Sequence, residues 1–385
     1  MTERIRKSLE IDGQEILSQQ EWNAELNEKQ QRLSEWLKRK EYSAILIRRH
    51  DNIAWATGGA SEGRVRIPQE TQVFSLLITA TGGRYYLAGK NEGPRMHDEE
   101  FGVTDFEPVL YDWYADALLS EAKRISGGKL AADYPTGDIP VENLYELREV
   151  LLPQEIARYR WLGEEVAAST ADVLSSLEPG MSDYEFEALV SAALLSGGVL
   201  PSVLLMGADD RILKYKHCVA RGGELRNYGM VNLCARKWGL VISITRFVHF
   251  GKLPQQLADC FAASAQVNAA VLDATREGTT SAQLFAVVKN AYAKVGHAEE
   301  IEKHAQGGTT GYNEREWVAT PAGIQVVRNS QAFAWNPSIK GTKVEDTVLL
   351  LDGTIEMLTE TPELPVVETS YNGKVYQSAG VLVRN

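Results

Sequence analysis

Along the first 150 positions, the spacing of apolar residues indicates helices interspersed with strands. Apolar positions at roughly helical spacing predict an amphipathic helix over residues 17–40. Short apolar runs predict four strands, at residues 44–47, 73–79, 85–87 and 129–132. A Thr-Gly-Gly turn at residues 81–83 joins the second and third as a hairpin. With helices predicted around residues 116–125 and 141–150, the pattern indicates an α/β domain built on a mixed sheet.

The pattern changes at Leu152, where long Ala-rich helical segments begin. We therefore predict two domains, residues 1–151 and 152–385. In the second domain one helix is predicted over residues 155–176, and another begins after Ser182. A glutamate three residues after this serine completes the pattern of a capping box.

The same two-helix arrangement occurs again with a constant offset of 98 residues (278 − 180). The matching pairs are Gly180 and Gly278, Ser182 and Thr280, Phe186 and Leu284, Leu189 and Val287, and Gly198 and Gly296. A hairpin-forming segment follows each copy, at residues 203–245 and 331–366. A duplication of this kind predicts a pseudo-twofold α/β unit whose helices cover one face of a curved sheet and leave a concave pocket on the other.

Charge and composition limit the expected partners and location. The formal net charge of -12 disfavours a nucleic acid or an anionic membrane as the main partner. The three cysteines lack CxxC spacing and are odd in number, so they indicate neither a disulfide framework nor a zinc site. The N-terminal segment MTERIRKSLEIDG lacks the apolar core of a signal peptide, and no apolar run approaches the roughly 18 residues of a membrane span. We therefore expect a cytoplasmic protein with no membrane and no nucleic-acid partner.

The segment VNLCARKWGLVISITR resembles the metal-binding hairpin of the creatinase and aminopeptidase P family, also called the pita-bread or M24 family. In that family the hairpin carries one Asp and then, eleven residues later, a second Asp followed by x-Thr-Arg. Here Gly239, Thr245 and Arg246 keep the family pattern. Asn232 and Ser243 stand at the two aspartate positions.

Three further motifs extend the resemblance. HAQGGTTG is similar to the family pattern HxxGHxxG, with His304 at the first histidine and Gly308 at the metal-ligand histidine. AWNPSIKG places Asn336 at the fourth ligand position, and VEDTVLL retains Glu345 at the fifth. The resemblance covers residues 152–385 and, more loosely, the N-terminal domain through NIAWATGG. It implies an α/β (α+β) fold with a creatinase-like N-terminal domain and a C-terminal pita-bread domain, and a homodimer.

Four of the five positions at which the family carries metal ligands therefore hold other residues. Amide and hydroxyl groups cannot balance the charge of two divalent cations, so we predict no metal and no other cofactor. Asn232, Ser243 and Asn336 have two interpretations that the sequence leaves open. They contact an organic ligand in the former metal volume, or they are neutral residues that avoid unpaired buried charge.

Two histidines and one glutamate are the predicted catalytic residues. The resemblance places His217, in KYKHCVA, at a pocket histidine of the family, and places His304 close to the substrate. With Glu345 across the pocket, these residues imply general acid–base chemistry without a metal. Alternatively, Glu345 is structural and pairs with a buried arginine such as Arg246.

Two polar segments near the expected pocket also have alternative interpretations. GYNEREW contains Tyr312 and Arg315, which either hold a carboxylate-bearing molecule or belong to an ordinary strand. The predicted substrate-binding residues are Asn232, Ser243, Arg246, Tyr312 and Asn336. The run DDRILKYK at residues 209–216 either lines an anion site or forms a solvated face, and the solvated face is the favoured interpretation.

Three functions are consistent with the resemblance. The main prediction is a metal-independent hydrolase of a C–N bond in a small molecule, in the manner of creatinase. The first alternative is a metal-dependent Xaa-Pro dipeptidase or aminopeptidase, against which the replaced ligands argue. The second alternative is a non-catalytic relative that binds a peptide or protein. The expected ligand is a small molecule or a short peptide.

Overall fold

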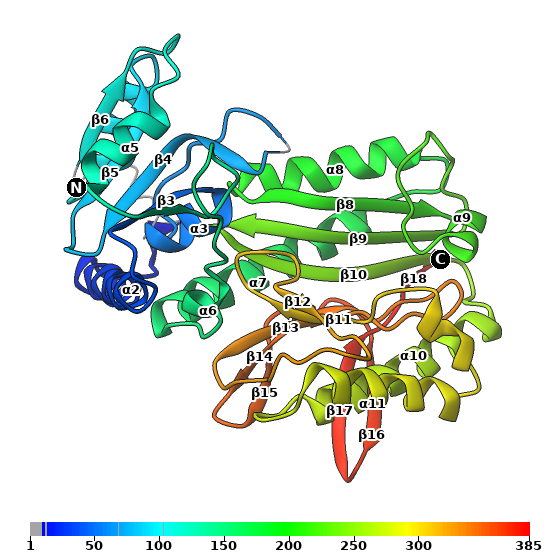
Figure 1. The fold of residues 1–385 in the computed structure, drawn as a ribbon. Helices are drawn as coiled ribbons and strands as arrows, with labels where there is room; N and C mark the ends of the chain where they lie inside the picture. Colours follow the sequence, from blue (N-terminus) through cyan, green and yellow to red (C-terminus); the bar gives the residue numbers. More distant parts are fainter. Residues whose placement is uncertain (1–9, 12–13, 68, 103) are drawn as a thin grey trace. The chain divides into compact units, whose positions relative to one another are not determined.

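The computed structural model describes residues 10–11, 14–67, 69–102 and 104–385, and the chain forms two compact units (Figure 1). Unit 1 contains residues 1–158 together with the short segment 238–240. Unit 2 contains residues 159–237 and 241–385. The chain passes from unit 1 to unit 2 within helix α7 (Pro153–Ser176).

Unit 1 is built on a five-stranded sheet with the order β6-β5-β4-β3-β7. Its strands are β3 (Ala44–Arg49), β4 (Thr71–Thr79), β5 (Arg84–Gly89), β6 (Glu107–Tyr111) and β7 (Leu130–Ala132). The sheet is mixed, because β4 is antiparallel to β3 and β5 whereas β7 and β6 run parallel to their neighbours. The α/β class, the mixed sheet and the 81–83 turn agree with the sequence pattern, which did not indicate β6.

The helices of unit 1 follow their capping signals. Helix α2 (Gln19–Arg39) begins after Ser18, whose side chain forms a capping box with Glu21. The predicted helix over residues 141–150 is wrong in length, because α6 covers only Tyr145–Arg148. Val141 instead bridges to Ala132, and the Asn143 side chain accepts a hydrogen bond from the Tyr145 backbone. The remaining elements of unit 1 are β1 (Glu10–Ile11), β2 (Gln14–Glu15), α3 (His50–Ala56), α4 (Gly93–Arg95), η1 (Met96–Phe101) and α5 (Leu118–Ser126).

A buried charge cluster joins α2 to the first turns of α7. The Arg158 guanidinium contacts Glu25 at 2.6 Å, and Lys29 contacts Glu25 at 2.6 Å and Glu155 at 2.8 Å. Burial alone would raise the pKa of Glu25, but the charges of Arg158 and Lys29 hold it at about 2. The cluster pairs two anions with two cations, which is the condition for burying charge at this depth.

Unit 2 contains two α/β halves. The first has helices α7 and α8 (Asp183–Ser196) and strands β8 (Leu200–Ala208), β9 (Tyr228–Lys237) and β10 (Leu240–Phe250), with α9 (Asp210–Lys214) between β8 and β9. The second has helices α10 (Gln255–Ala274), α11 (Ser281–Lys294) and η2 (Ala298–Glu302) and strands β11 (Gly307–Thr310), β12 (Trp317–Val318), β13 (Gln331–Trp335), β14 (Asp346–Leu351) and β15 (Thr354–Met357). Strands β16 (Val366–Tyr371), β17 (Lys374–Ala379) and β18 (Leu382–Arg384) complete it. None of the described helices combines the length and apolarity that a membrane span requires.

The predicted duplication is confirmed at the level of local structure. Gly180 and Gly278 both adopt a left-handed backbone, with φ of 98° and 89°, which a residue with a side chain rarely adopts. Ser182 and Thr280 each form a complete capping box at the start of α8 and α11. Helix α8 packs on β8, and α10 packs on β16 and α11.

Unit 2 has two larger sheets that are joined along β10, where the Val241 amide donates to the Gly311 carbonyl at 2.9 Å. One sheet has the order β18-β10-β9-β8, and the other has the order β12-β11-β13-β14-β15. They are also bridged where the Thr245 amide, on β10, donates to the Glu345 carbonyl at 3.1 Å, one residue before β14. This junction brings the motif residues of both halves together.

Candidate functional site

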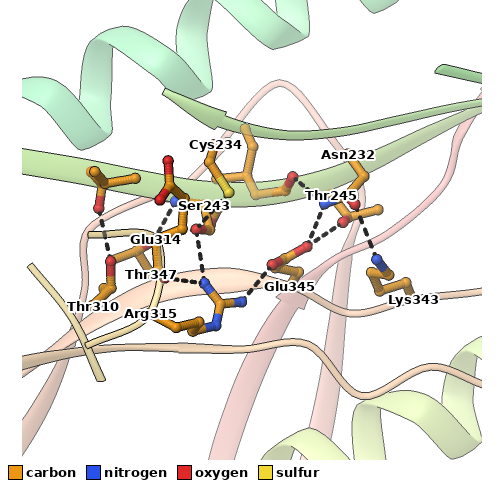
Figure 2. Close-up of polar contacts among 12 residues, drawn as sticks. Asn232, Cys234, Ser243, Thr245, Thr310, Glu314, Arg315, Lys343, Glu345 and Thr347 are labelled. Carbon is orange, nitrogen blue, oxygen red and sulfur yellow. Dashed lines mark hydrogen bonds and ion pairs between the residues drawn. The ribbon is translucent and has the colours of Figure 1, made fainter. Parts of the chain in front are cut away.

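The candidate site surrounds the junction between β10 and β14 (Figure 2). Asn232 projects from β9, whereas Ser243 and Thr245 project from the same face of β10 because side chains two residues apart share a face. All three are at least 95% buried, with exposed fractions of 5%, 0% and 3%. Polar side chains buried to this degree require partners, and the structure provides them.

Glu345 has both carboxylate oxygens engaged by protein donors. Its Oε2 accepts from Asn232 Nδ2 at 2.6 Å and from Thr245 Oγ1 at 2.7 Å. Its Oε1 accepts from the Arg315 guanidinium at 3.0 Å. The Glu345 side chain is 2% exposed, so its negative charge is balanced inside the protein by Arg315.

Two cationic side chains lie among the residues at the ligand positions. Arg315 donates to Ser243 Oγ at 3.1 Å as well as to Glu345 (Figure 2). Lys343 donates from Nζ to Asn232 Oδ1 at 3.1 Å and is 3% exposed. Burial lowers the pKa of Lys343, and the nearby charge of Glu345 opposes this shift. Asn232 therefore connects Glu345 to Lys343, and Ser243 contacts Arg315.

The sequence pattern pointed to Arg315 but not to Lys343. Arg315 belongs to GYNEREW, which was expected near the pocket. A signal for Lys343 was present, because Lys343, Glu345 and Thr347 alternate in a segment that leads into β14. Thr347 also turns to the hairpin, where its Oγ1 accepts from the Ser243 amide at 2.8 Å. The alternation places all three residues beside β9 and β10.

Gly308 lies in β11 between two neighbouring strands, paired with Val318 on one side and Ala334 on the other. A Cβ atom at this position would lie 1.9 Å from the Trp317 carbonyl oxygen and 3.0 Å from the Val318 Cα. Both are backbone atoms, so they cannot move aside as a flexible side chain can. The position that carries a histidine ligand in the family therefore has no room here for any side chain.

Asn336 lies one residue after β13 and is 9% exposed. Its backbone amide donates to the Gln306 carbonyl at 3.2 Å. Its side-chain Oδ1 is buried and accepts no hydrogen bond from the residues that the structure describes. The structure therefore places Asn336 in the interior but does not connect its side chain to the Glu345 network.

The two predicted catalytic histidines lie together. His304 Nε2 and His217 Nε2 are 3.2 Å apart, and the ring centroids are 5.2 Å apart with an interplanar angle of 70°. Burial lowers the pKa of His304 to about 2, with further contributions from the Lys343 charge and from His217. Burial and Lys343 also lower the pKa of His217. Both imidazoles are therefore neutral at pH 7. The recorded hydrogen bonds of the Glu345 carboxylate go to Asn232, Thr245 and Arg315, and none of them joins it to the histidine pair.

The neutral His304 makes stability depend on pH. An unfolded histidine takes up a proton as the pH falls below about 6.5, whereas folded His304, with its pKa at about 2, does not. We expect the free energy of unfolding to decrease by up to about 1.4 kcal/mol per pH unit below pH 6.5 on account of this residue. Urea unfolding measured between pH 7.5 and pH 5 should show a shallower decrease for His304→Gln. The exposed His97 provides the control, and equal slopes for wild type, His304→Gln and His97→Gln would contradict the assignment.

Arg246 and Tyr312, the other predicted binding residues, lie in the interior. Arg246 pairs with Asp346 at 2.6 Å and donates to the Thr359 carbonyl at 2.7 Å. It reaches Glu345 only through the backbone carbonyl, at 3.1 Å, so Arg315 and not Arg246 is the ion-pair partner of that carboxylate. The Tyr312 side chain is fully buried.

Comparison with known proteins identifies the family. The model of metallopeptidase family M24 matches residues 158–352, just over half of the chain. The chain belongs to metallopeptidase family M24. No curated protein is significantly similar to it in sequence.

Solved structures share the fold of this M24 chain over nearly its whole length. The Xaa-Pro dipeptidase from Bacillus anthracis superposes with a TM-score of 0.72 at 16% identity, covering 93% of this chain and 99% of that one. The X-Pro aminopeptidase from Thermotoga maritima has a TM-score of 0.68 at 18% identity and covers 87% and 98%. The N-terminal domain of FACT complex subunit SPT16 from chickpea has a TM-score of 0.65 at 12% identity and covers 87% and 97%. At these identities the likeness concerns the fold.

The residues at the five M24 ligand positions do not fit a pair of divalent cations. They supply two amides, one hydroxyl, one glycine and a single carboxylate, whereas such sites need several anionic or imidazole ligands. The carboxylate is already paired with Arg315, and Lys343 adds a second positive charge beside Asn232. Within the described part of the chain, no three His, Cys, Asp or Glu residues are grouped as a metal ion would need.

Proposed function

We propose that this M24 protein is a metal-independent hydrolase of a C–N bond in a small amide or short peptide. The observation that carries the proposal is the contact between His217 Nε2 and His304 Nε2 at 3.2 Å. In this contact one neutral imidazole donates its N–H and the other offers a lone pair. His217 is the more exposed of the two, which leaves it accessible to water and to a ligand.

Hydrolysis of a C–N bond needs a general base for the attacking water and a general acid for the leaving nitrogen, and the histidine pair supports both roles. The neutral imidazole of His217 accepts a proton from water as the water oxygen attacks the carbonyl carbon of the substrate, because His304, with its pKa at about 2, is too weak a base. The same proton is then delivered to the leaving nitrogen as the C–N bond breaks, so one water is consumed and no redox partner is required. Arg315 and Lys343, which lower the pKa of His304, also provide a positive field for the negative charge that develops on the carbonyl oxygen.

The class of substrate is supported by the family and by the solved relatives. Structures of an Xaa-Pro dipeptidase and of an X-Pro aminopeptidase superpose on this chain over at least 87% of its length. Both are named as peptidases of Xaa-Pro sequences. A metal-dependent dipeptidase is the alternative that this likeness favours, and the donor set at the ligand positions argues against it.

A second candidate function is binding without catalysis. It is favoured by the state of Glu345, whose two carboxylate oxygens accept hydrogen bonds from Asn232, Thr245 and Arg315. A carboxylate held in this way is not available to orient an attacking water. Under this alternative the fold would hold a peptide or small molecule, and the histidine pair would contribute hydrogen bonds only.

A turnover assay on chelator-treated protein tests the proposal. A panel of dipeptides and small amides is screened for release of amine, and metal content is measured on the same sample. We expect turnover without bound metal, and a loss of about 100-fold or more in kcat/KM for His217→Ala. His97→Ala, an exposed histidine of unit 1, is the matched control and should retain full activity.

The three outcomes of this assay separate the candidate functions. Turnover that survives the chelator and is lost in His217→Ala supports the metal-independent hydrolase. Turnover that requires added metal, with near-stoichiometric metal in the active sample, supports the metal-dependent dipeptidase and overturns the proposal. Saturable binding of a panel member without any turnover supports the non-catalytic alternative.

A further inference from the structure

A cavity of about 930 Å³ lies in unit 2 beside Lys343. Its walls come from α9, α10, η2 and the segment 338–343 that leads toward β14. The residues at the five ligand positions do not line it, and neither do His217 and His304. Lys343 connects the two regions, because it lines the cavity and donates to Asn232. The cavity therefore adjoins the candidate site and shares only Lys343 with the groups assigned to the proposed hydrolysis.

Positive charge is in excess on the cavity walls. Five lysines and two glutamates line it, for a formal balance of +3 (5 − 2). The glutamates are matched within the wall, because Glu300 contacts Lys216 at 2.7 Å and Glu299 contacts Lys303 at 3.6 Å. Among the described residues, Lys340 and Lys343 have no carboxylate partner within 4 Å. An excess of unpaired cations in a concave site favours an anionic ligand.

Lys343 has donors available for such a ligand. The structure records one hydrogen bond for its Nζ, to Asn232 Oδ1 at 3.1 Å, within the described part of the chain. An ammonium group carries three N–H donors, so two remain. The side chain is 97% buried, the nearby Glu345 is paired with Arg315, and a buried ammonium without a direct anionic partner is unfavourable. An anion in the cavity would supply the missing partner.

Part of the remaining wall is apolar, and Gln256, His297, Ser338 and Thr342 also line it. Ile212, Met230 and Ile339 are buried, with exposed fractions of 5%, 3% and 0%, and Leu257 packs against the same core cluster. The volume lies in the range of about 300–1,000 Å³ found for sites of small organic ligands. An inorganic ion would leave the apolar surface uncovered. The fit is to a molecule with one anionic group and an apolar body.

We propose that this cavity binds a small organic anion, a carboxylate or a phosphate monoester, with its anionic oxygens on Lys340 and Lys343 and its apolar body on Met230 and Leu257. The proposal goes beyond the hydrolase function, since binding here requires neither His217 nor turnover. It also changes the interpretation of DDRILKYK, because Lys214 and Lys216 of this run line the cavity.

Calorimetric titration of the full chain with three probes of similar size tests the site: 4-phenylbutyrate, phenyl phosphate and the neutral 4-phenylbutanamide. We expect at least one anion to bind about tenfold more tightly than the amide. Lys343→Met should weaken that binding about tenfold, and Lys340→Gln, an exposed position that should not disturb folding, about threefold. Lys289→Gln, an exposed charge change on α11 outside the cavity, should leave it unchanged.

Each result decides the proposal. Binding of the carboxylate alone, of the phosphate alone, or of both supports the site and identifies the head group. Equal affinity for the amide, no binding of either anion up to about 10 mM, or Lys340→Gln and Lys343→Met variants that bind as Lys289→Gln does would overturn it. His217→Ala should bind the anion as wild type does, so failure of this site is distinguishable from failure of the hydrolase.

Discussion

Replacing Arg315 by Met is expected to lower the free energy of unfolding by about 3 kcal/mol. Arg315 is the ion-pair partner of Glu345 at 3.0 Å, and the Glu345 side chain is only 2% exposed. Without the guanidinium, a carboxylate remains buried with hydrogen bonds but without a direct counter-charge. Ser243 Oγ also loses the donor that contacts it at 3.1 Å. Equilibrium unfolding in urea at pH 7 measures the effect.

Two further variants isolate the charge effect. Arg160→Met removes an ion pair of similar geometry, at 2.6 Å to Glu356, but one that is 46% and 34% exposed. It should cost less than about 1 kcal/mol. The double variant Arg315→Met with Glu345→Gln should recover more than half of the loss, because a neutral amide oxygen still accepts from Asn232 and Thr245. If Arg315→Met lowers the free energy of unfolding no more than Arg160→Met does, Arg315 is not the counter-charge that stabilises Glu345.

Replacing Gly308 by Ala is expected to cost about 3 kcal/mol or to prevent folding. The added Cβ would lie 1.9 Å from the Trp317 carbonyl oxygen, so strand β12 has to separate from β11. Gly311→Ala is the matched control in the same segment, because its Cβ meets only the Glu316 side chain, with Oε1 nearest at 3.2 Å. Urea unfolding of the two variants under identical conditions measures the difference.

The consequence of this prediction concerns the metal. A histidine at position 308 would need more room than an alanine, so restoring the ligand set of the family would also require a different spacing of β11 and β12. If Gly308→Ala is as stable as Gly311→Ala, the strands can adjust and a few substitutions at the ligand positions would suffice. If the variant loses much of its free energy of unfolding, the spacing of β11 and β12 itself excludes a histidine ligand at this position.

Several local features could be predicted from sequence because neighbouring residues determine them. The capping boxes at Ser182 and Thr280 and the left-handed turns at Gly180 and Gly278 depend on a few consecutive residues, and each appears where the pattern placed it. Strand β6 was missed because its five residues contain a proline and lack a clear alternation. The 141–150 helix was overestimated because Val141 pairs with Ala132, a contact that the local pattern does not encode.

The residues of the candidate site could be located from the sequence, but their hydrogen-bond partners could not be predicted. The motifs identified Asn232, Ser243 and Glu345 as neighbours, and the structure joins Glu345 to Asn232 directly and to Ser243 through Arg315. Of the two interpretations of Asn232 and Ser243, only contact with an organic ligand required an open volume beside them. The structure instead fills their hydrogen bonds with Arg315 and Lys343.

The sequence by itself determined the duplicated fold, the order of the motifs and the replacement of four ligands, because these reside in residue identity and short spacing. Only the tertiary structure decided which cations balance Glu345, that position 308 has no room for a side chain, and that His217 meets His304. Arg315 reaches Glu345 across 30 residues of chain, and Lys343 reaches Asn232 across 111. The first contact depends on the order of strands within one sheet and the second on how two sheets meet, and elementary sequence patterns carry no information about distances between segments that far apart.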